Sequence, residues 1–161
     1  MYGARIHAAI LALVTATSVW AMDSPKPEPK KDKDPAMEQA RAAIAKEDWT
    51  RAQGVLREAV ARNPQDADAH NLYAYSLRKG PNPQMDVVFR HYNEALRIDP
   101  KHRAAHEYLG EAYLQVGKLE LAEQELKALV KICFFSCEEY RDLKEEIARY
   151  KREHPRSASL I

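Results

Sequence analysis

The sequence predicts an all-α fold built from repeated helix pairs, and three observations carry that prediction. Only 5 of the 161 residues are glycine, which leaves little material for tight β-hairpins or phosphate-binding loops. Alanine, leucine, glutamate, lysine and arginine are abundant, and all five favour helix. Two similar sequence segments, AVARNP and ALRIDP, end at Pro64 and Pro100. We therefore expect successive helix pairs of similar length.

Charge and length exclude several classes of function. The chain has 25 Lys and Arg against 24 Asp and Glu, so no field of one sign would attract nucleic acid or anionic lipid. Its length fits about one domain. We find no nucleophile with a base, paired carboxylate site or glycine-rich loop, so we expect no enzyme and no cofactor.

Residues 1–21 have the features of a signal peptide. Arg5 precedes an uncharged run from Ala8 to Trp20, which is shorter than the roughly 20 residues of a membrane span. Small residues precede Met22 where a signal peptidase would read them, so cleavage would leave Met22 first. We expect a periplasmic or secreted protein without a stable membrane span after cleavage. An uncleaved anchor is the alternative.

Residues 22–35 are predicted to be a Pro/Lys-rich linker. From residue 23 onward the segment has four prolines, alternating charges and no apolar residue. Such a segment cannot bury enough surface to offset its chain entropy.

Three segments, 36–66, 67–100 and 103–132, share one apolar spacing and are each predicted to form two antiparallel helices. The third segment carries this spacing most completely, at Leu109, Gly110, Tyr113, Gly117 and Ala122. The second carries it at Ala74, Tyr92, Ala95 and Pro100, with a longer turn between its helices. The first carries it at Ala40, Ala52, Leu56, Ala59 and Pro64, but has Gln39 where a large apolar residue is usual. This spacing resembles the tetratricopeptide repeat, a helix-turn-helix unit of 34 residues.

Small residues are expected where the two helices of a repeat approach closely. Ala40, Ala74 and Gly110 hold these positions in the first helices, and Ala52 and Ala122 hold them in the second helices. Helix starts are indicated by three residues with capping side chains, each followed by proline or tryptophan: Asp34, Asp48 and Asn82.

A capping helix is expected to close the stack after the third repeat, within residues 133–155. Its apolar residues recur at spacings of three and four: Tyr140, Leu143, Ile147 and Tyr150. Ser136 and Glu139 have the spacing of a capping box at its start. Residues 156–161 are expected to form a frayed tail.

Cys133 and Cys137 lie between the last repeat helix and the capping helix. For an exported protein this pair favours a structural disulfide. Two alternatives stay open: a copper-handling site and a thiol-redox pair, because a thiol near a helix start has a lowered pKa. The histidines His70, His102 and His106 are expected to pack as polar residues, so no metal site is predicted from them.

The resemblance to tetratricopeptide repeats implies a binding scaffold whose first helices form a concave groove for a peptide or an envelope protein. The register places six residues along that groove: Arg41, Asn71, Tyr75, Arg78, Glu107 and Glu111. The lysine, arginine and asparagine clamp that some members use for a carboxylate is not matched here. The partner is unidentified, nucleic acid is not expected, and self-association stays an alternative.

Overall fold

The computed structural model describes residues 34–134 and 136–155. This part of the chain forms seven α-helices and contains no strand, which confirms the all-α class. The expected signal peptide 1–21, nearly all of the linker 22–35 and the tail 156–161 lie outside the described residues.

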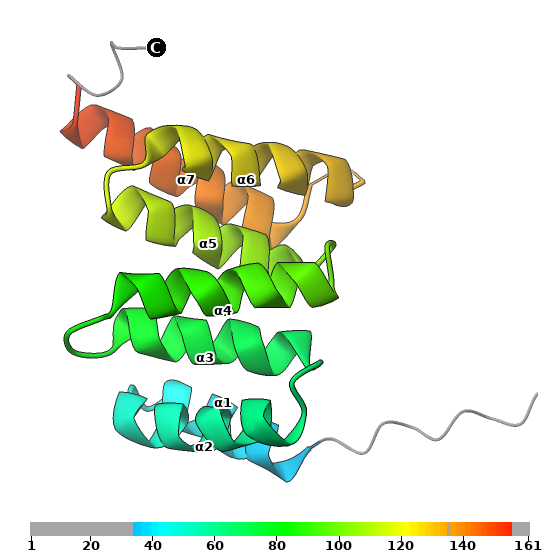
Figure 1. Ribbon diagram of the computed structural model, residues 1–161. Coiled ribbons are helices and arrows are strands. Elements are labelled where there is room, and N and C mark those ends of the chain that lie inside the picture. The colour runs from blue at the N-terminus through cyan, green and yellow to red at the C-terminus, as the bar shows by residue number, and fades with distance from the viewer. Residues whose placement is uncertain (1–33, 135, 156–161) are drawn as a thin grey trace, which may run out of the picture. The chain divides into compact units, whose positions relative to one another are not determined.

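The helices form three antiparallel pairs followed by a single helix. The pairs are α1 (Pro35–Ile44) with α2 (Trp49–Arg62), α3 (Ala67–Lys79) with α4 (Met85–Ile98), and α5 (Arg103–Gln115) with α6 (Leu119–Ile132). The last helix, α7 (Glu138–Glu153), packs against both α5 and α6. Figure 1 shows the helices side by side in chain order from α2 to α6, as expected for a repeat stack.

The core runs through the stack as three adjoining clusters. Most buried positions of the first pair are alanine, so its two helices can approach closely. The middle cluster joins α3, α4 and α5 around Tyr92, whose side chain is fully buried. The last cluster joins α5, α6 and α7 around Leu129 and Leu143. No helix in the described part of the chain has the length and apolar character needed to span a membrane.

The small residues predicted at close approaches are buried, but Gly110 faces a different helix from the one expected. Ala40, Ala52, Ala74 and Ala122 are fully buried within the helix pairs. A Cβ atom at Gly110 would lie 2.6 Å from Leu143 Cδ2, so the glycine makes room for the capping helix α7 rather than for α6. The third repeat therefore carries its glycine where α7 lies closest.

The turn between the two helices of each repeat contains a residue in the left-handed region. Its φ is 54° at Glu47, 55° at Asn82 and 77° at Gly117. Asn82 is therefore a turn residue and not the expected helix cap, because the N-cap of the next helix is Gln84. The following helix α4 begins at Met85. At the two other predicted starts, Asp34 and Asp48 do accept capping hydrogen bonds.

The start of α7 also differs from the prediction. Cys137 is its N-cap and no side chain caps it, so the Ser136–Glu139 capping box is wrong. Glu139 lies in the first turn and pairs with Arg103 of α5, with Nε and Oε1 3.5 Å apart. The acidic first turn still suits the positive end of the helix dipole.

Candidate functional site

The first helices of the second and third repeats, α3 and α5, and the last helix α7 border a hollow of about 780 Å³. Its lining comes from α3 at Arg78 and Lys79, from the end of α5 and the turn that follows it, and from the last two turns of α7 with its C-cap. We call this the α3/α5/α7 hollow. Two of the six predicted groove residues, Arg78 and Glu111, line it, and most of its lining is polar or charged.

Arg78 joins three helices beside this hollow. Its Nη2 donates to Glu111 Oε2 on α5 at 2.6 Å, and its Nε donates to the Tyr92 hydroxyl on α4 at 3.4 Å. Burial lowers the pKa of Arg78, but Tyr92 and Glu111 more than offset this effect, so the net pKa is raised. Only 7% of its side chain is exposed, and its charge is balanced by Glu111. Arg78 therefore links helices within the fold.

Two tyrosines cover Arg78 on the same face. The ring centroids of Tyr75 on α3 and Tyr108 on α5 are 4.8 Å apart. The Arg78 guanidinium carbon lies 5.7 Å from the Tyr75 centroid and 6.0 Å from that of Tyr108. Burial raises the pKa of Tyr108 to about 12, so its hydroxyl stays protonated. The pair offers a partly exposed aromatic surface next to the hollow.

The other predicted groove residues lie in different surroundings. Arg41 on α1 is exposed and pairs with Asp68 of α3, with Nη2 and Oδ2 3.7 Å apart. Asn71 is buried, and its Oδ1 has no hydrogen-bond partner in the described structure. Glu107 is also buried, at 8% exposure, and its pKa is raised to about 8, first by burial and then by neighbouring carboxylates.

The structure thus brings Tyr75, Arg78 and Glu111 together, whereas Arg41 makes its contact with a different residue, Asp68. Sequence reasoning missed Tyr108 and the bond from Arg78 to Tyr92. Tyr108 directly follows Glu107. The periodic pattern of apolar residues does not distinguish a tyrosine on the groove face from one that packs in the core. The Tyr92 bond depends on a helix contact that spacing alone does not specify.

His70 and His106 are buried and hydrogen-bonded, in keeping with the polar-packing prediction, whereas His102 is the N-cap of α5. His70 Nε2 donates to the Pro64 carbonyl at 3.2 Å, and His106 Nε2 donates in the same way to Pro100 at 3.1 Å. The other ring nitrogen, Nδ1, faces His91 Nδ1 at 2.9 Å in the second repeat, and Glu125 Oε2 at 2.7 Å in the third. The described residues include no group of three or more His, Cys, Asp or Glu placed to hold a metal ion.

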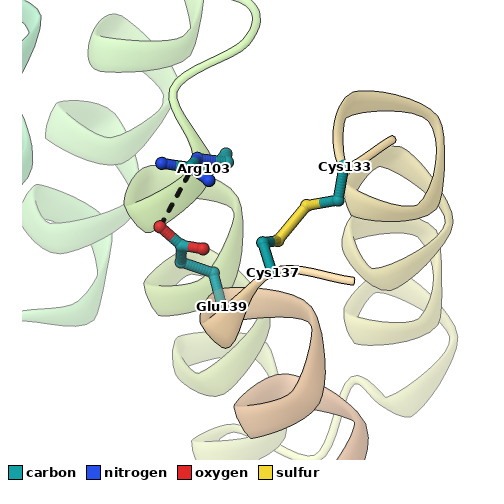
Figure 2. The surroundings of a disulfide bond; sticks show 4 residues. All are labelled: Arg103, Cys133, Cys137 and Glu139. Carbon is teal, nitrogen blue, oxygen red and sulfur yellow. Dashed lines mark ion pairs between the residues drawn. A yellow bond between two sulfur atoms is a disulfide. The ribbon is translucent and has the colours of Figure 1, made fainter. Parts of the chain in front are cut away.

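Cys133 and Cys137 are joined by a disulfide, with their Cα atoms 5.7 Å apart. Figure 2 shows the bond between the end of α6 and the start of α7, beside the Arg103–Glu139 ion pair. In this state neither sulfur is a thiolate, so neither can act as a copper ligand or as an attacking thiol. The arrangement matches the structural pairing that the sequence favours.

Comparison with known proteins points to one family. Two models of the tetratricopeptide repeat match the chain, over residues 37–84 and 88–147. No curated protein sequence matches it.

Several solved structures are similar in fold. The TPR2B domain of yeast Sti1, solved in complex with pHsp70, is 20% identical with a TM-score of 0.64, and the match covers 73% of this chain and 94% of that one. SycD, a type III secretion translocator chaperone of Yersinia enterocolitica, is 15% identical with a TM-score of 0.65, covering 74% and 83%. The same chaperone in complex with a peptide of the translocator YopD is 16% identical with a TM-score of 0.61, covering 73% and 88%. At these identities the likeness shows the fold.

Proposed function

The chain belongs to the tetratricopeptide repeat family, and on that premise we propose that it is a binding module that holds a peptide segment of another protein in the α3/α5/α7 hollow. The observation that carries the proposal is the hollow itself, which spans α3, α5 and α7 and lies beside the Tyr75–Tyr108 ring pair. Structures similar in fold have been solved with peptide or protein partners, which supports the same reading. Proteins of this family are generally scaffolds without catalytic activity, and the proposal includes no reaction.

The test is selection of peptides from a random display library on the purified protein, followed by affinity measurement with matched surface variants. Gln115 is exposed and lines the α3/α5/α7 hollow, so Gln115→Trp should fill it and weaken binding at least about tenfold. Gln124 is exposed on α6 and lines a separate hollow of about 780 Å³, so Gln124→Trp is the matched control. Loss of binding only in Gln124→Trp would place the site on α6 instead.

We also propose that the module acts outside the cytoplasm. Residues 1–21 have the pattern of a signal peptide, and a disulfide such as Cys133–Cys137 persists in oxidising compartments. Intact-mass measurement of the exported protein should give a chain that begins at Met22. A mass that includes residues 1–21 would indicate a retained anchor.

A further inference from the structure

Glu107 is a buried acid without a countercharge. It lies on α5, and 8% of the residue is exposed. Among the described residues it has neither a hydrogen bond nor an ion pair, although buried carboxylates are usually paired. This burial costs stability at any pH where the carboxylate ionises, so a role beyond packing is indicated.

The charges around Glu107 make the position strongly negative. The carboxylates that act on it come from Glu111 on α5 and from Glu138, Glu139 and Asp142 on α7. Glu111 is held by Arg78, and Glu139 is held by Arg103. Asp142 is exposed and belongs to no ion pair within the described chain, so its charge is not neutralised there, and Glu107 adds a second negative charge once the pH rises above its pKa of about 8.

A second acceptor without a donor lies at the corresponding place on the neighbouring first helix. Asn71 and Glu107 each directly follow one of the equivalent histidines, His70 and His106, so they occupy the same register position on α3 and α5. These two helices are in contact. Asn71 is 3% exposed and its Oδ1 accepts no hydrogen bond in the described structure. Two adjacent first helices therefore carry, at the same register position, a buried amide oxygen without a donor and a mostly buried carboxyl group without a hydrogen bond in the described structure.

These acceptors suit an organic cation better than a metal ion. The described acidic residues include no group of three or more spaced to hold a metal. A lysine ammonium has three donors on a long apolar stem, and an arginine guanidinium has five donors. Either can reach a partly buried acid between two helices while its stem lies against the Tyr75 and Tyr108 rings.

We propose that a lysine or arginine side chain of the bound peptide occupies the position beside Glu107 and Asp142, so that the protein selects segments that are basic at this point. This inference rests on the proposed function and adds the chemistry of the partner. The bound cation would supply the countercharge that Glu107 lacks in the free protein.

The test uses peptides selected from the random library on the full chain. We expect lysine or arginine to be enriched at one position, and replacing it by acetyl-lysine or citrulline should weaken binding about tenfold or more. Glu107→Gln and Asp142→Asn should each reduce the preference for the basic peptide, and Asp142 is exposed, so its variant is expected to fold normally. Glu145→Gln, also exposed on α7, is the control and should bind as the wild type does.

A pH series gives a second readout. Affinity for the basic peptide should rise about tenfold between pH 6.5 and 8.5, because Glu107 ionises near pH 8 while lysine stays charged. Glu107→Gln should abolish that rise. The titratable groups that act on Glu107 are Tyr75 on α3, Tyr108 and Glu111 on α5, and Glu138, Glu139 and Asp142 on α7. Arg78 of α3 and Arg103 of α5 are the cations paired with two of these carboxylates, Glu111 and Glu139.

The outcomes separate this inference from the proposed function. Peptides that Gln115→Trp releases but that bind equally well with acetyl-lysine would overturn the inference and leave the proposed function standing. A pH rise that persists in Glu107→Gln would also overturn the inference. A library that gives no peptide sensitive to Gln115→Trp would contradict both.

Discussion

Glu107 ionises at a much higher pH in the folded protein than in the unfolded chain. Its pKa is 4.5 when unperturbed and is raised to about 8 in the fold, first by burial and then by Glu111 and the carboxylates of α7. The folded state therefore favours the protonated acid. Its contribution to stability is fully present below pH 4.5 and is lost as pH rises through about 8.

Glu107→Gln should remove that loss, because glutamine is neutral at every pH. We expect the variant to be more stable than the wild type at pH 9 by about 2–4 kcal/mol, with a much smaller difference at pH 5. Urea unfolding at the two pH values measures it, with Glu145→Gln as the exposed control. Parallel stability curves for wild type and Glu107→Gln would show that Glu107 is not perturbed.

Two helical glycines provide a matched test of close packing. A Cβ at Gly110 would meet Leu143, which is fully buried, whereas a Cβ at Gly54 would meet nothing within 4 Å. Gly110→Ala should cost about 1–3 kcal/mol through overpacking. Gly54→Ala should gain about 0.5–1 kcal/mol, because alanine favours helix. Thermal unfolding of the two variants and the wild type measures both changes in stability. Equal effects of the two substitutions would mean that α7 does not approach α5 at Gly110.

At the scale of elements, the second and third repeats each have a histidine at the same position in the first helix, but the two histidines have different side-chain partners. His70 and His106 both donate to the proline carbonyl that precedes their helix. In the second repeat the partner of Nδ1 is His91, whose pKa is lowered to about 4, first by burial and then by His70 and Arg90, although Glu94 acts in the opposite sense. In the third repeat the partner is Glu125, which with Pro100 offsets the effect of burial and raises the pKa of His106.

His91→Glu should give the second repeat the ion pair of the third and reduce its sensitivity to acid. A histidine with a depressed folded pKa stabilises the fold above its unfolded value of 6.5, and this stability is lost as pH falls toward about 4. The wild type should therefore lose about 1–2 kcal/mol more than His91→Glu between pH 7 and pH 5. Chemical unfolding at both pH values measures the difference. An equal loss in both proteins would show that His91 does not set the acid response.

At the scale of the whole molecule, each helix pair contacts only its neighbours, so stability is distributed along the chain. The disulfide and the Arg103–Glu139 pair act at one end, where they attach the start of α7 to α6 and α5. The first pair, α1 and α2, lies two repeats away. A change at the disulfide should therefore have a local effect.

Replacing Cys133 and Cys137 together by serine should loosen α7 while α1 to α4 stay folded. The closed loop is short, with a sequence separation of 4, so the loss of stability should be about 2 kcal/mol or less. Hydrogen exchange should show faster exchange in α7 and in the parts of α5 and α6 that it covers. Faster exchange throughout the chain would contradict local attachment. Unchanged exchange in α7 together with lost copper or thiol-exchange activity would instead favour the copper-handling or thiol-redox function that the cysteine pair leaves open.

The sequence by itself determined the helical class, the family resemblance, the disulfide partners and the residues that lie on the first helices. These follow from local rules: periodicity, small residues at fixed spacing, and two cysteines close in sequence. It also placed Asp34 and Asp48 correctly as caps, because capping depends on neighbouring residues.

Only the tertiary structure decided which of the predicted groove residues already have partners within the fold. Arg78 donates its hydrogen bonds to Glu111 and Tyr92 within the fold. Glu107, in contrast, is buried near the carboxylates of α7 and has no hydrogen-bond partner in the described structure. It also decided that Gly110 accommodates Leu143 of α7. Neither follows from spacing, because burial and charge pairing depend on side chains brought together from helices far apart in the chain.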